Sequence, residues 1–497
     1  MNWNFLFVFM FTSLAIFQGK AQTILNVGPG RTYSNPAQAA AVAKPGDTIL
    51  IHPASYSGTF FIENLKGSPA KWIYIRGTNK DQVIFQGGTE SMHFSDPNYL
   101  HISNITIAGQ TGNGMNIDDG GSYDSPAKKL VIDQCIFKNI AATGNNDMLK
   151  LSGLDSFVIS NCIFENGAAG GSGIDMVGCH VGTFIKNKFT NMGSNSIQAK
   201  GGTSNLHIER NYFVNGGQRS LNLGGSTGAA FFRPIGANYE AKDLLVTANI
   251  FEGSWCPIAY VGSRNVVVSN NTIIQPQNWI IRILQESSDT SYYQSCANNS
   301  FNNNIVVVTN SLSTDVNIGP NTLPATFKFS NNLWYHLQNT SWRGPQLPTP
   351  ETNAIIQKNP LFTDFANKNY NLTANSPAIG KGKPYNGILF DYADKQFKNP
   401  PSIGAFEGNL TIANKENNTI NSIELFPNPA TDYIILDKLS MLVKIQLTNL
   451  NGQLIEELNC NASKIQINIK NYPVGLYVLN VLDLKTNAKK LFIIQKI

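Results

Sequence analysis

The chain has 497 residues, of which 42% are hydrophobic and 14% charged, so it can bury a large core and is too long for one ordinary compact domain. Its net charge of +5 at pH 7 is small for this length, and no run of Lys and Arg alternates with aromatic residues. These features argue against a nucleic-acid-binding protein. The 42 Gly residues and the scarcity of helix-favouring stretches predict an all-β fold of short strands joined by many turns.

The first residues predict export. The apolar run FLFVFMFTSLAIF, from Phe5 to Phe17, is too short to span a bilayer, and Gly19-Lys20-Ala21 follows it as a small-x-small cleavage site. We therefore expect a signal peptide over residues 1–21, with Gln22 as the first mature residue. No later segment is long and apolar enough to span a membrane.

The next segment predicts the start of a solenoid. Ala37 to Ala43 is expected to form a short amphipathic helix that caps the open end of a core. The turn Pro45-Gly46-Asp47 and a first strand from Thr48 to His52 follow it.

A repeated phrase, Asn-x-(Ile/Phe), then runs through the chain. The intervals between its copies are 26, 24, 38 and 22 residues by subtraction, so the period is near 24 with one insertion. Units of this length without a helix predict a parallel β-helix, in which each turn buries its apolar face against its neighbours. The turn amides are expected to stack into a ladder. The copies are Asn161, Asn187, Asn211, Asn249 and Asn271, with Asn104 and Gln134 in the same place earlier.

Two of the six cysteines share the repeat. Cys135 in QCIF and Cys162 in NCIF are expected on successive turns, either as stacked thiols or as a disulfide. Six Cys in an exported chain of this length do not indicate a disulfide framework.

One strand of each turn can be aligned as LKLSG, IDMVG, IQAKG, LNLGG, IAYVG and IRILQ. Since side chains alternate along a strand, the apolar residues of each phrase point inward and the middle polar residue points outward. A mixture of charged and amide groups is unusual on a plain sheet surface, so we expect a ligand groove, with a solvated face as the alternative. The outward column is Lys150, Asp175, Gln198, Asn222, Ala259 and Arg282, and a second outward column contains Ser152, Val177 and Lys200.

The insertion from Ser226 to Asp243 interrupts the period and is expected to form a loop that walls the groove, with Phe231, Phe232, Arg233 and Tyr239. By position alone, the predicted substrate-binding residues are Lys150, Gln198, Asn222, Arg233, Arg282 and Glu286.

The opening segment and the closing segment, NPLFTDFANKNYNLTANSPAIGKG through SIGAFEG, resemble those of many secreted right-handed β-helix polysaccharide lyases and glycosidases. The resemblance covers about residues 23–408, and it implies a right-handed parallel β-helix over residues 22–408. It is specific for the fold and weak for the activity.

A polar stretch over residues 409–422 is interpreted as a linker, and alternating strands behind it predict a small β-sandwich over residues 423–497. This part closely resembles the C-terminal sorting domain of the type IX secretion system. The matching phrases are Phe426-Pro427-Asn428-Pro429, Asn451-Gly452, Gly475-Leu476-Tyr477 and Lys489-Lys490. The resemblance implies secretion or cell-surface display through a Bacteroidota-type route, with the secretion machinery as a partner. The alternative is a carbohydrate-binding sandwich.

A rigid groove suits a polymer, and the first hypothesis is β-elimination on a uronic-acid-containing polysaccharide. That reaction needs a group to neutralise the uronate, a base for the C5 proton and a donor for the leaving oxygen. Lys200 is the candidate base, followed by Gly201 and Gly202, which allow close approach of a ligand. The alternative for Lys200 is a solvated surface lysine.

The arrangement loosely resembles polysaccharide lyase family six, which implies a Lys base, an Arg acid on a neighbouring turn and a calcium ion beside them. Arg219 is the corresponding acid. However, it precedes LNLGG rather than lying in the family's LRHG-like phrase, so Arg233 or Arg282 could act instead. A calcium ion could be held by Asp118, Asp147 and Asp175. Asp119 is interpreted as a turn residue and His180 as loop structure. Asp175 is also assigned to the catalytic group because it neighbours Lys200.

Two other functions remain open from the sequence. An inverting glycoside hydrolase needs two carboxyl groups on opposite sides of the bond, for which Asp147 with Asp175, or Asp118 with Asp175, could serve. A non-catalytic glycan-binding surface protein needs only the solenoid and the sorting domain. In each case we expect a monomer that binds a polysaccharide.

Overall fold

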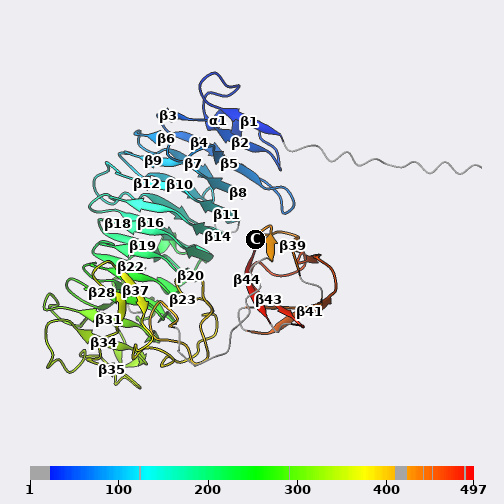
Figure 1. Cartoon of the computed structure of the whole chain (residues 1–497). Coiled ribbons are helices and arrows are strands. Elements are labelled where there is room, and N and C mark those ends of the chain that lie inside the picture. Colours follow the sequence, from blue (N-terminus) through cyan, green and yellow to red (C-terminus); the bar gives the residue numbers. More distant parts are fainter. Residues whose placement is uncertain are drawn as a thin grey trace, which may run out of the picture.

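The computed structural model describes residues 23–122, 125–289, 291–408, 423–439, 442–449, 452–485 and 488–497. The predicted signal peptide and the predicted linker lie outside the described residues, as do Leu450 and Asn451 of one predicted turn. The chain forms a right-handed parallel β-helix, followed by a small antiparallel β-sandwich. Figure 1 shows the solenoid strands stacked as successive rungs from β1 to β35.

Three parallel sheets form the faces of the solenoid. The first, here called the long sheet, consists of β1 (Ile24–Val27), β2 (Thr48–Ile51), β5 (Ile73–Gly77), β8 (Asn98–Ser103), β11 (Ala127–Asp133), β14 (Leu154–Ser160), β17 (His180–Ile185), β20 (Thr203–Glu209), β23 (Ala241–Thr247), β26 (Ser263–Arg264), β27 (Val267–Ser269), β30 (Ser300–Asn302) and β33 (Lys328–Ser330).

The second, here called the groove sheet, carries the aligned phrases of the sequence. It consists of β4 (Phe60–Glu63), β7 (Met92–Ser95), β10 (Met115–Asp118), β13 (Leu149–Ser152), β16 (Ser172–Val177), β19 (Asn195–Lys200), β22 (Arg219–Gly224), β25 (Ile258–Val261), β29 (Ile281–Leu284) and β32 (Val316–Ile318).

The third sheet follows the turn that bears the asparagines. It consists of β3 (Ala54–Tyr56), β6 (Val83–Gln86), β9 (Thr106–Ala108), β12 (Ile136–Lys138), β15 (Ile163–Glu165), β18 (Lys188–Thr190), β21 (Tyr212–Val214), β24 (Ile250–Glu252), β28 (Thr272–Ile274), β31 (Ile305–Val308), β34 (Leu333–His336) and β35 (Ile355–Ile356).

The open N-terminal end of the core is covered by α1 (Pro36–Ala40), as the sequence predicted, although the helix begins earlier and ends sooner than expected. It begins there because the side chain of Asn35 accepts a hydrogen bond from the backbone N–H of Gln38 and Pro36 fits the first turn. Ala39 is completely buried against the core. Two 3-10 turns, η1 (Ala229–Phe231) and η2 (Pro324–Thr326), lie in loops.

The core repeats from turn to turn because its residues do. All the residues predicted to point inward on the groove sheet, from Leu149 to Ile283, are fully buried. On the third sheet, Phe137, Phe164, Phe189, Phe213 and Phe251 stack with ring centroids 4.7 to 5.1 Å apart. This spacing matches the distance between neighbouring strands, so each ring packs on the next.

The asparagine ladder is present but one residue out of the predicted register at its start. Buried Asn187, Asn211, Asn249 and Asn271 each donate to the side-chain oxygen of the asparagine on the following turn. Asn161 does not belong to this ladder. It has a left-handed backbone with φ of 53°, as Gln134 and Asn104 have in their turns, and the position level with Asn187 is held by Cys162.

Cys162 lies at the N-terminal end of this ladder, where its backbone N–H donates a hydrogen bond to Asn187 Oδ1. All six cysteines are buried free thiols, which answers the open question about Cys135 and Cys162 in favour of stacked thiols. Burial raises the pKa of the Cys162 thiol well above its usual value. The pair is therefore part of the core.

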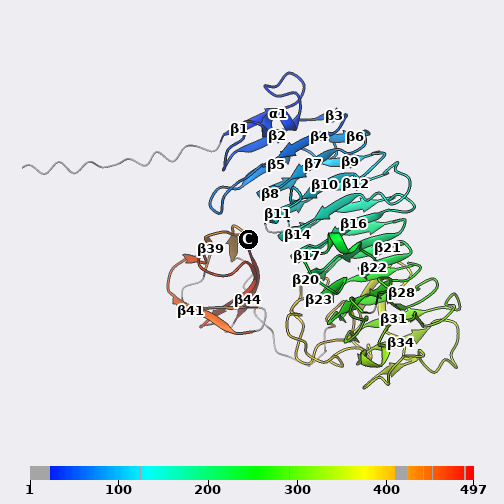
Figure 2. The same cartoon turned by 180° about the vertical axis from the view of Figure 1, so that it is seen from behind.

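After β35 a short hairpin of β36 (Phe362–Asp364) and β37 (Asn369–Leu372) leads to an exit segment over residues 381–408. The sandwich behind it, seen beside the solenoid in Figure 2, has a three-stranded sheet of β38 (Glu424–Phe426), β39 (Tyr433–Asp437) and β42 (Lys464–Asn468). Its second sheet contains β41 (Leu454–Cys460), β40 (Val443–Asn449), β43 (Gly475–Asp483) and β44 (Lys489–Lys496). The helices of the described residues are all too short to cross a membrane.

Candidate functional site

The outward column of the groove sheet has the register that the aligned phrases predicted. Lys150 pairs with Asp175, which pairs with Gln198 on the next turn. The column continues through Asn222, Ala259 and Arg282. These side chains therefore stand in one row along the solenoid axis, at a spacing of about 4.8 Å per turn.

At the N-terminal end of this row, two lysines share one buried carboxylate. Asp175 is only 1% exposed, and its Oδ2 contacts the ammonium groups of both Lys150 and Lys200, the latter at 3.3 Å. Asp147 is also buried, and its Oδ2 lies 3.6 Å from Lys150 Nζ. The other oxygen of Asp175 is buried and has no hydrogen-bond partner among the described residues. The structure thus brings Lys150, Asp147, Asp175 and Lys200 into one cluster.

The electrostatics of the cluster keep Lys150 charged. Burial on its own lowers the pKa of Lys150, but the adjacent Asp175 and Asp147 carboxylates outweigh it and raise the pKa above its ordinary value. Burial, followed by the charge of Asp175, raises the pKa of Asp147 to about 6. Asp147 is therefore a carboxyl group whose charge changes in a mildly acidic range.

A cavity of about 520 Å³ opens above the cluster. Lys150 and Lys200 of the groove sheet line it, together with Asp119 and with Phe231 of the insertion, which is 65% exposed. Burial is the largest influence that raises the pKa of Asp119. A side chain at Gly153 would overlap the Asp119 carboxylate, so a glycine is required for Asp119 to lean into the cavity.

The loop that walls the cavity is the predicted insertion, and Arg233 anchors it. Both terminal nitrogens of Arg233 donate to Asp155, at 2.7 and 2.6 Å, and Nη1 also donates to the backbone oxygen of Gly178. Arg233 is buried by these bonds and also lines the cavity, so it positions the loop, and its contact with substrate stays a prediction. His180 begins β17 rather than lying in a loop as predicted, and its Nδ1 is hydrogen-bonded to the same arginine. Although burial opposes it, pairing with His180 and Arg233 lowers the pKa of Asp155 to about 2.

Glu240 stabilises the C-terminal end of the same loop through hydrogen bonds. Its buried carboxylate accepts hydrogen bonds from the backbone N–H groups of Gly201 and Thr227 and from the hydroxyl of Ser287. Because Gly201 directly follows Lys200, this carboxylate couples the loop to the strand end that carries the lysine.

Farther along the row lies a second polar group, which contacts Trp279 through Arg282. Arg219 donates to Asn222 Oδ1 at 3.1 Å and to Glu286 Oε1 at 2.7 Å. The guanidinium of Arg282 lies 4.5 Å from the ring centroid of Trp279. Burial, followed by the charge of Arg219, lowers the pKa of Arg282. Arg219, the predicted acid, and the predicted substrate contacts Asn222, Arg282 and Glu286 therefore belong to one part of the groove.

Trp279 packs edge-to-face on Trp255, which is 47% exposed. The two tryptophans were missed in the sequence. Trp255 lies three residues before β25, and Trp279 lies two residues before β29 on the adjacent turn. Two tryptophans so close to the starts of adjacent groove-sheet strands were the available signal that both belong to the groove.

Lys200 and Arg219 do not come together. Arg219 on β22 is level with Asn195 on β19, and Asn195 precedes Lys200 by five residues on that strand. The backbones of Arg219 and Lys200 are therefore separated by roughly 16 Å along the strand direction. Arg219 is instead held by Glu286. The pairing of these two residues as base and acid at one bond is therefore not favoured by the geometry.

The three aspartates assigned to calcium do not form a joint site. Asp118 lies on another column, level with Ser152, and its Oδ2 is 2.6 Å from His93 Nε2. Lys150 contacts both Asp147 and Asp175. No group of three or more His, Cys, Asp or Glu suited to a metal ion occurs in the part of the chain that the structure describes. Calcium prefers six to eight oxygen ligands, and this donor set does not fit it.

Comparison with known families and structures agrees with this architecture. Residues 92–233 match the family model described as right handed beta helix region, and residues 424–495 match the secretion system C-terminal sorting domain. No curated protein matches the sequence.

Among solved structures, the pectate lyase Pel9A aligns with a TM-score of 0.50 at 15% identity, over 78% of this chain and 96% of that one. An alginate lyase from Paenibacillus sp. str. FPU-7 aligns with a TM-score of 0.39 at 14% identity, over 63% and 97%. The catalytic unit of a GH87 alpha-1,3-glucanase from Streptomyces thermodiastaticus strain HF3-3 aligns with a TM-score of 0.39 at 13% identity, over 68% of each chain. At these identities the similarity to Pel9A shows the fold alone. The chain thus carries a right-handed β-helix and a secretion system C-terminal sorting domain, which indicates export by type IX secretion to the cell surface or the medium.

Proposed function

We propose that the protein is a secreted polysaccharide lyase that cleaves an anionic, uronic-acid-containing polysaccharide by β-elimination. The observation that supports this most is the pair of lysines, Lys150 and Lys200, that share the buried Asp175 at the floor of the groove cavity. Two ammonium groups in a cavity attract a uronate, and one of them can remain a fixed cation while the other exchanges a proton.

Each step of the elimination has a residue in this cavity. Lys150 neutralises the uronate carboxylate, which acidifies the C5 proton, and the raised pKa of Lys150 keeps it charged. Lys200 in its amine form takes the C5 proton as the bond from C4 to the leaving oxygen breaks. We assign protonation of that oxygen to Asp119, which lines the cavity and whose pKa is raised by burial.

The burial of the paired aspartates disfavours the hydrolase alternative. An inverting hydrolase needs two carboxyl groups on opposite sides of the bond with space for a water molecule. Asp147 and Asp175 are both buried beside the same ammonium group of Lys150. Neither has the free approach to substrate that an acid and a base on opposite faces require.

The rest of the row is proposed to bind neighbouring sugars of the polymer. Gln198 and Asn222 follow Asp175 turn by turn, and Arg282 stands two turns beyond Asn222. Arg219, Arg282 and Glu286 supply hydrogen-bonding groups near Trp279, whose ring could support a sugar ring. Since one chain supplies the whole cavity, we propose that the protein acts as a monomer.

The direct test follows the ultraviolet absorbance of the unsaturated uronate while the mature protein is incubated with alginate, pectate and chondroitin sulfate. The wild type should produce the absorbance with one of them, and Lys200→Ala should abolish it. Lys188→Ala, which removes an exposed lysine from the third sheet, is the matched control and should keep full activity. New reducing ends without absorbance would favour hydrolysis, and binding without either signal would favour a non-catalytic glycan-binding protein.

A further inference from the structure

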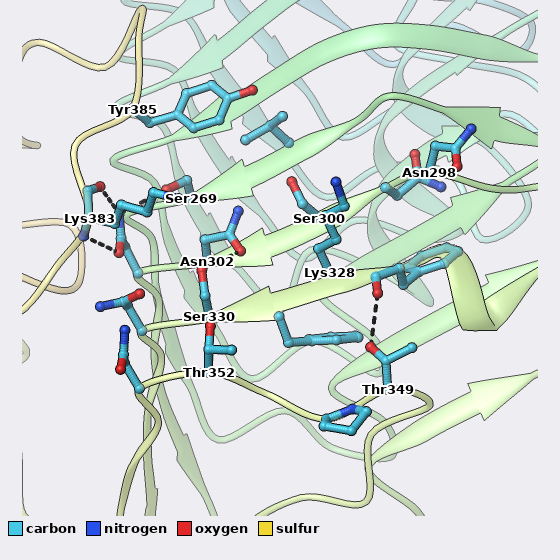
Figure 3. Close-up of a pocket in the computed structure, with 18 of the residues that line it drawn as sticks. Ser269, Asn298, Ser300, Asn302, Lys328, Ser330, Thr349, Thr352, Lys383 and Tyr385 are labelled. Carbon is cyan, nitrogen blue, oxygen red and sulfur yellow. Dashed lines mark hydrogen bonds between the residues drawn. The ribbon is translucent and has the colours of Figure 1, made fainter.

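A second cleft lies on the outer face of the long sheet, near the C-terminal end of the solenoid. It has a volume of about 810 Å³ and is here called the outer cleft. Its floor is formed by β27, β30 and β33, and one wall is the exit segment at Lys383, Pro384 and Tyr385 (Figure 3). The cleft shares no lining residue with the cavity at Lys200.

The floor presents rows of small polar side chains. Ser269, Asn302 and Ser330 are level on successive strands, and Thr352 bridges to Ser330. In the parallel row, Ser300 stands beside Lys328. Figure 3 shows these residues projecting from neighbouring strands toward the same space. A regular array of hydroxyl and amide groups suits the hydroxyl groups of a sugar chain.

Much of this hydrogen-bonding capacity is unused within the protein. Among the described residues, the side chains of Asn298, Ser300 and Lys328 make no hydrogen bond or ion pair, and Asn302 only accepts one from Ser330 at 3.0 Å. Tyr385 stands on the wall formed by the exit segment and is 45% exposed. An exposed ring facing polar groups across a cleft is the usual composition of a carbohydrate site.

The wall is fixed rather than free. Asn303 donates to the backbone oxygen of Lys383 at 2.8 Å and accepts from its N–H at 2.9 Å, and Asn331 donates to the oxygen of Lys381 at 2.9 Å. The cleft therefore exists before any ligand binds, which lowers the entropic cost of binding.

The charge of the cleft selects among glycans. Lys328 and Lys383 line it, and none of its described lining residues is Asp or Glu. Neither lysine has an ion pair in the part of the chain that the structure describes. An anionic sugar chain would supply the missing counter-charges.

We propose that the outer cleft binds an anionic polysaccharide at a second site, independent of the groove on the other sheet. Such a site would hold the protein on its polymer and raise the local concentration of chain ends and segments near the groove. The inference does not depend on the cleavage reaction, because a protein without lyase activity could use the cleft in the same way.

The test is affinity electrophoresis of the full mature protein in gels that contain alginate, polygalacturonate or chondroitin sulfate, with dextran as the neutral control. Lys200→Ala is used as the background so that the polymer is not degraded. At least one anionic polymer should retard this protein, and dextran should not. Adding Lys328→Ala and Lys383→Ala together should weaken the retardation by about three- to tenfold, since two exposed ion pairs are lost. Tyr385→Ala should also weaken it, and Lys188→Ala should leave it unchanged.

Retardation that is undiminished by the loss of both lysines, or the absence of retardation by every anionic polymer, would overturn the proposal. Equal retardation by dextran would overturn its electrostatic part. A wild-type dimer in light scattering that becomes a monomer on Tyr385→Ala would identify the cleft as a contact between copies of this chain. Thermal unfolding checks that each variant is folded, and cleavage by the same variants with Lys200 intact reports separately on the lyase proposal.

Discussion

The ammonium group of Lys200 lies 3.3 Å from Oδ2 of Asp175, on the adjacent turn of the solenoid. Asp175 is buried, and its carboxylate also contacts Lys150. Asp175 thus faces two ammonium groups, and Asp147 lies 3.6 Å from the one on Lys150.

Asp175→Asn should destabilise the protein by about 3 kcal/mol, because the partly buried ammonium groups of Lys150 and Lys200 lose the buried carboxylate that they share. Lys150→Met added to this variant should recover part of the loss, since the unpaired charge is then removed. Chemical denaturation of the wild type, both single variants and the double variant measures the coupling. Strictly additive effects on the free energy of unfolding would show that the contact between Asp175 and Lys150 contributes no coupling energy.

The raised pKa of Asp147 predicts that the stability of the protein depends on pH. Its pKa in the folded protein, about 6, lies above the ordinary value of 3.8, so the folded state holds the proton more tightly than the unfolded state. The contribution of Asp147 to stability is therefore fully present below pH 4 and is lost as the pH rises through 6, by on the order of 3 kcal/mol in total. Asp147→Asn should remove this contribution. Parallel stability curves for the wild type and the variant, measured by denaturation between those pH values, would contradict the assignment.

Gly153→Ala should reduce activity by displacing Asp119. The new methyl group overlaps the Asp119 carboxylate, and the backbone at Gly153 has φ of 65°. Gly144→Ala is the matched control, because Gly144 has φ of 69° and open space where the methyl group would lie. Both variants should lose about 1 kcal/mol to left-handed strain, and only Gly153→Ala should also lose turnover. Equal turnover in the two variants would remove Asp119 from the mechanism.

Trp279→Ala should raise KM for a long polymer and leave the turnover of the shortest cleavable oligosaccharide unchanged. The ring supports Arg282 at the part of the groove beyond Asn222, remote from Lys200. Steady-state kinetics on a size series of oligosaccharides measures this. A uniform loss of kcat at every length would indicate a structural role instead.

Phe189→Ala should cost about 3 to 5 kcal/mol, because the ring is fully buried between Phe164 and Phe213 in the core stack. Phe61→Ala on the outer face of β4 is the control, with an expected change within about 0.5 kcal/mol. Denaturation midpoints compare the two. Similar losses of stability in the two variants would mean that a ring in the phenylalanine stack contributes no more to stability than an exposed ring does.

The sequence was sufficient for the architecture and for the register of the groove sheet. Strand alternation and the 24-residue period depend only on local pattern, so the pattern alone places Lys150, Asp175 and Gln198 in one row. The asparagine ladder was misaligned at Asn161 because two successive positions of the turn both favour Asn. One needs a left-handed backbone and the other a stacked amide, and Asn270 with Asn271 fills both.

The details of the site could not be read from the chain in the same way. Arg233 bonds to Asp155 across 78 residues of sequence, and no local pattern reports that contact. The separation of Lys200 from Arg219 follows from where each lies along its strand, which the sequence left open. Trp255 and Trp279 occur once each in their turns, so the repeat did not draw attention to them.

The central claim is tested most directly by the ultraviolet absorbance of unsaturated uronate, with wild-type protein and Lys200→Ala compared on alginate, pectate and chondroitin sulfate. The account predicts a rise with the wild type on one of these polymers, no rise with Lys200→Ala, and an unchanged rise with Lys188→Ala. A wild-type rise that persists undiminished in Lys200→Ala, or reducing ends formed without any rise, would contradict it.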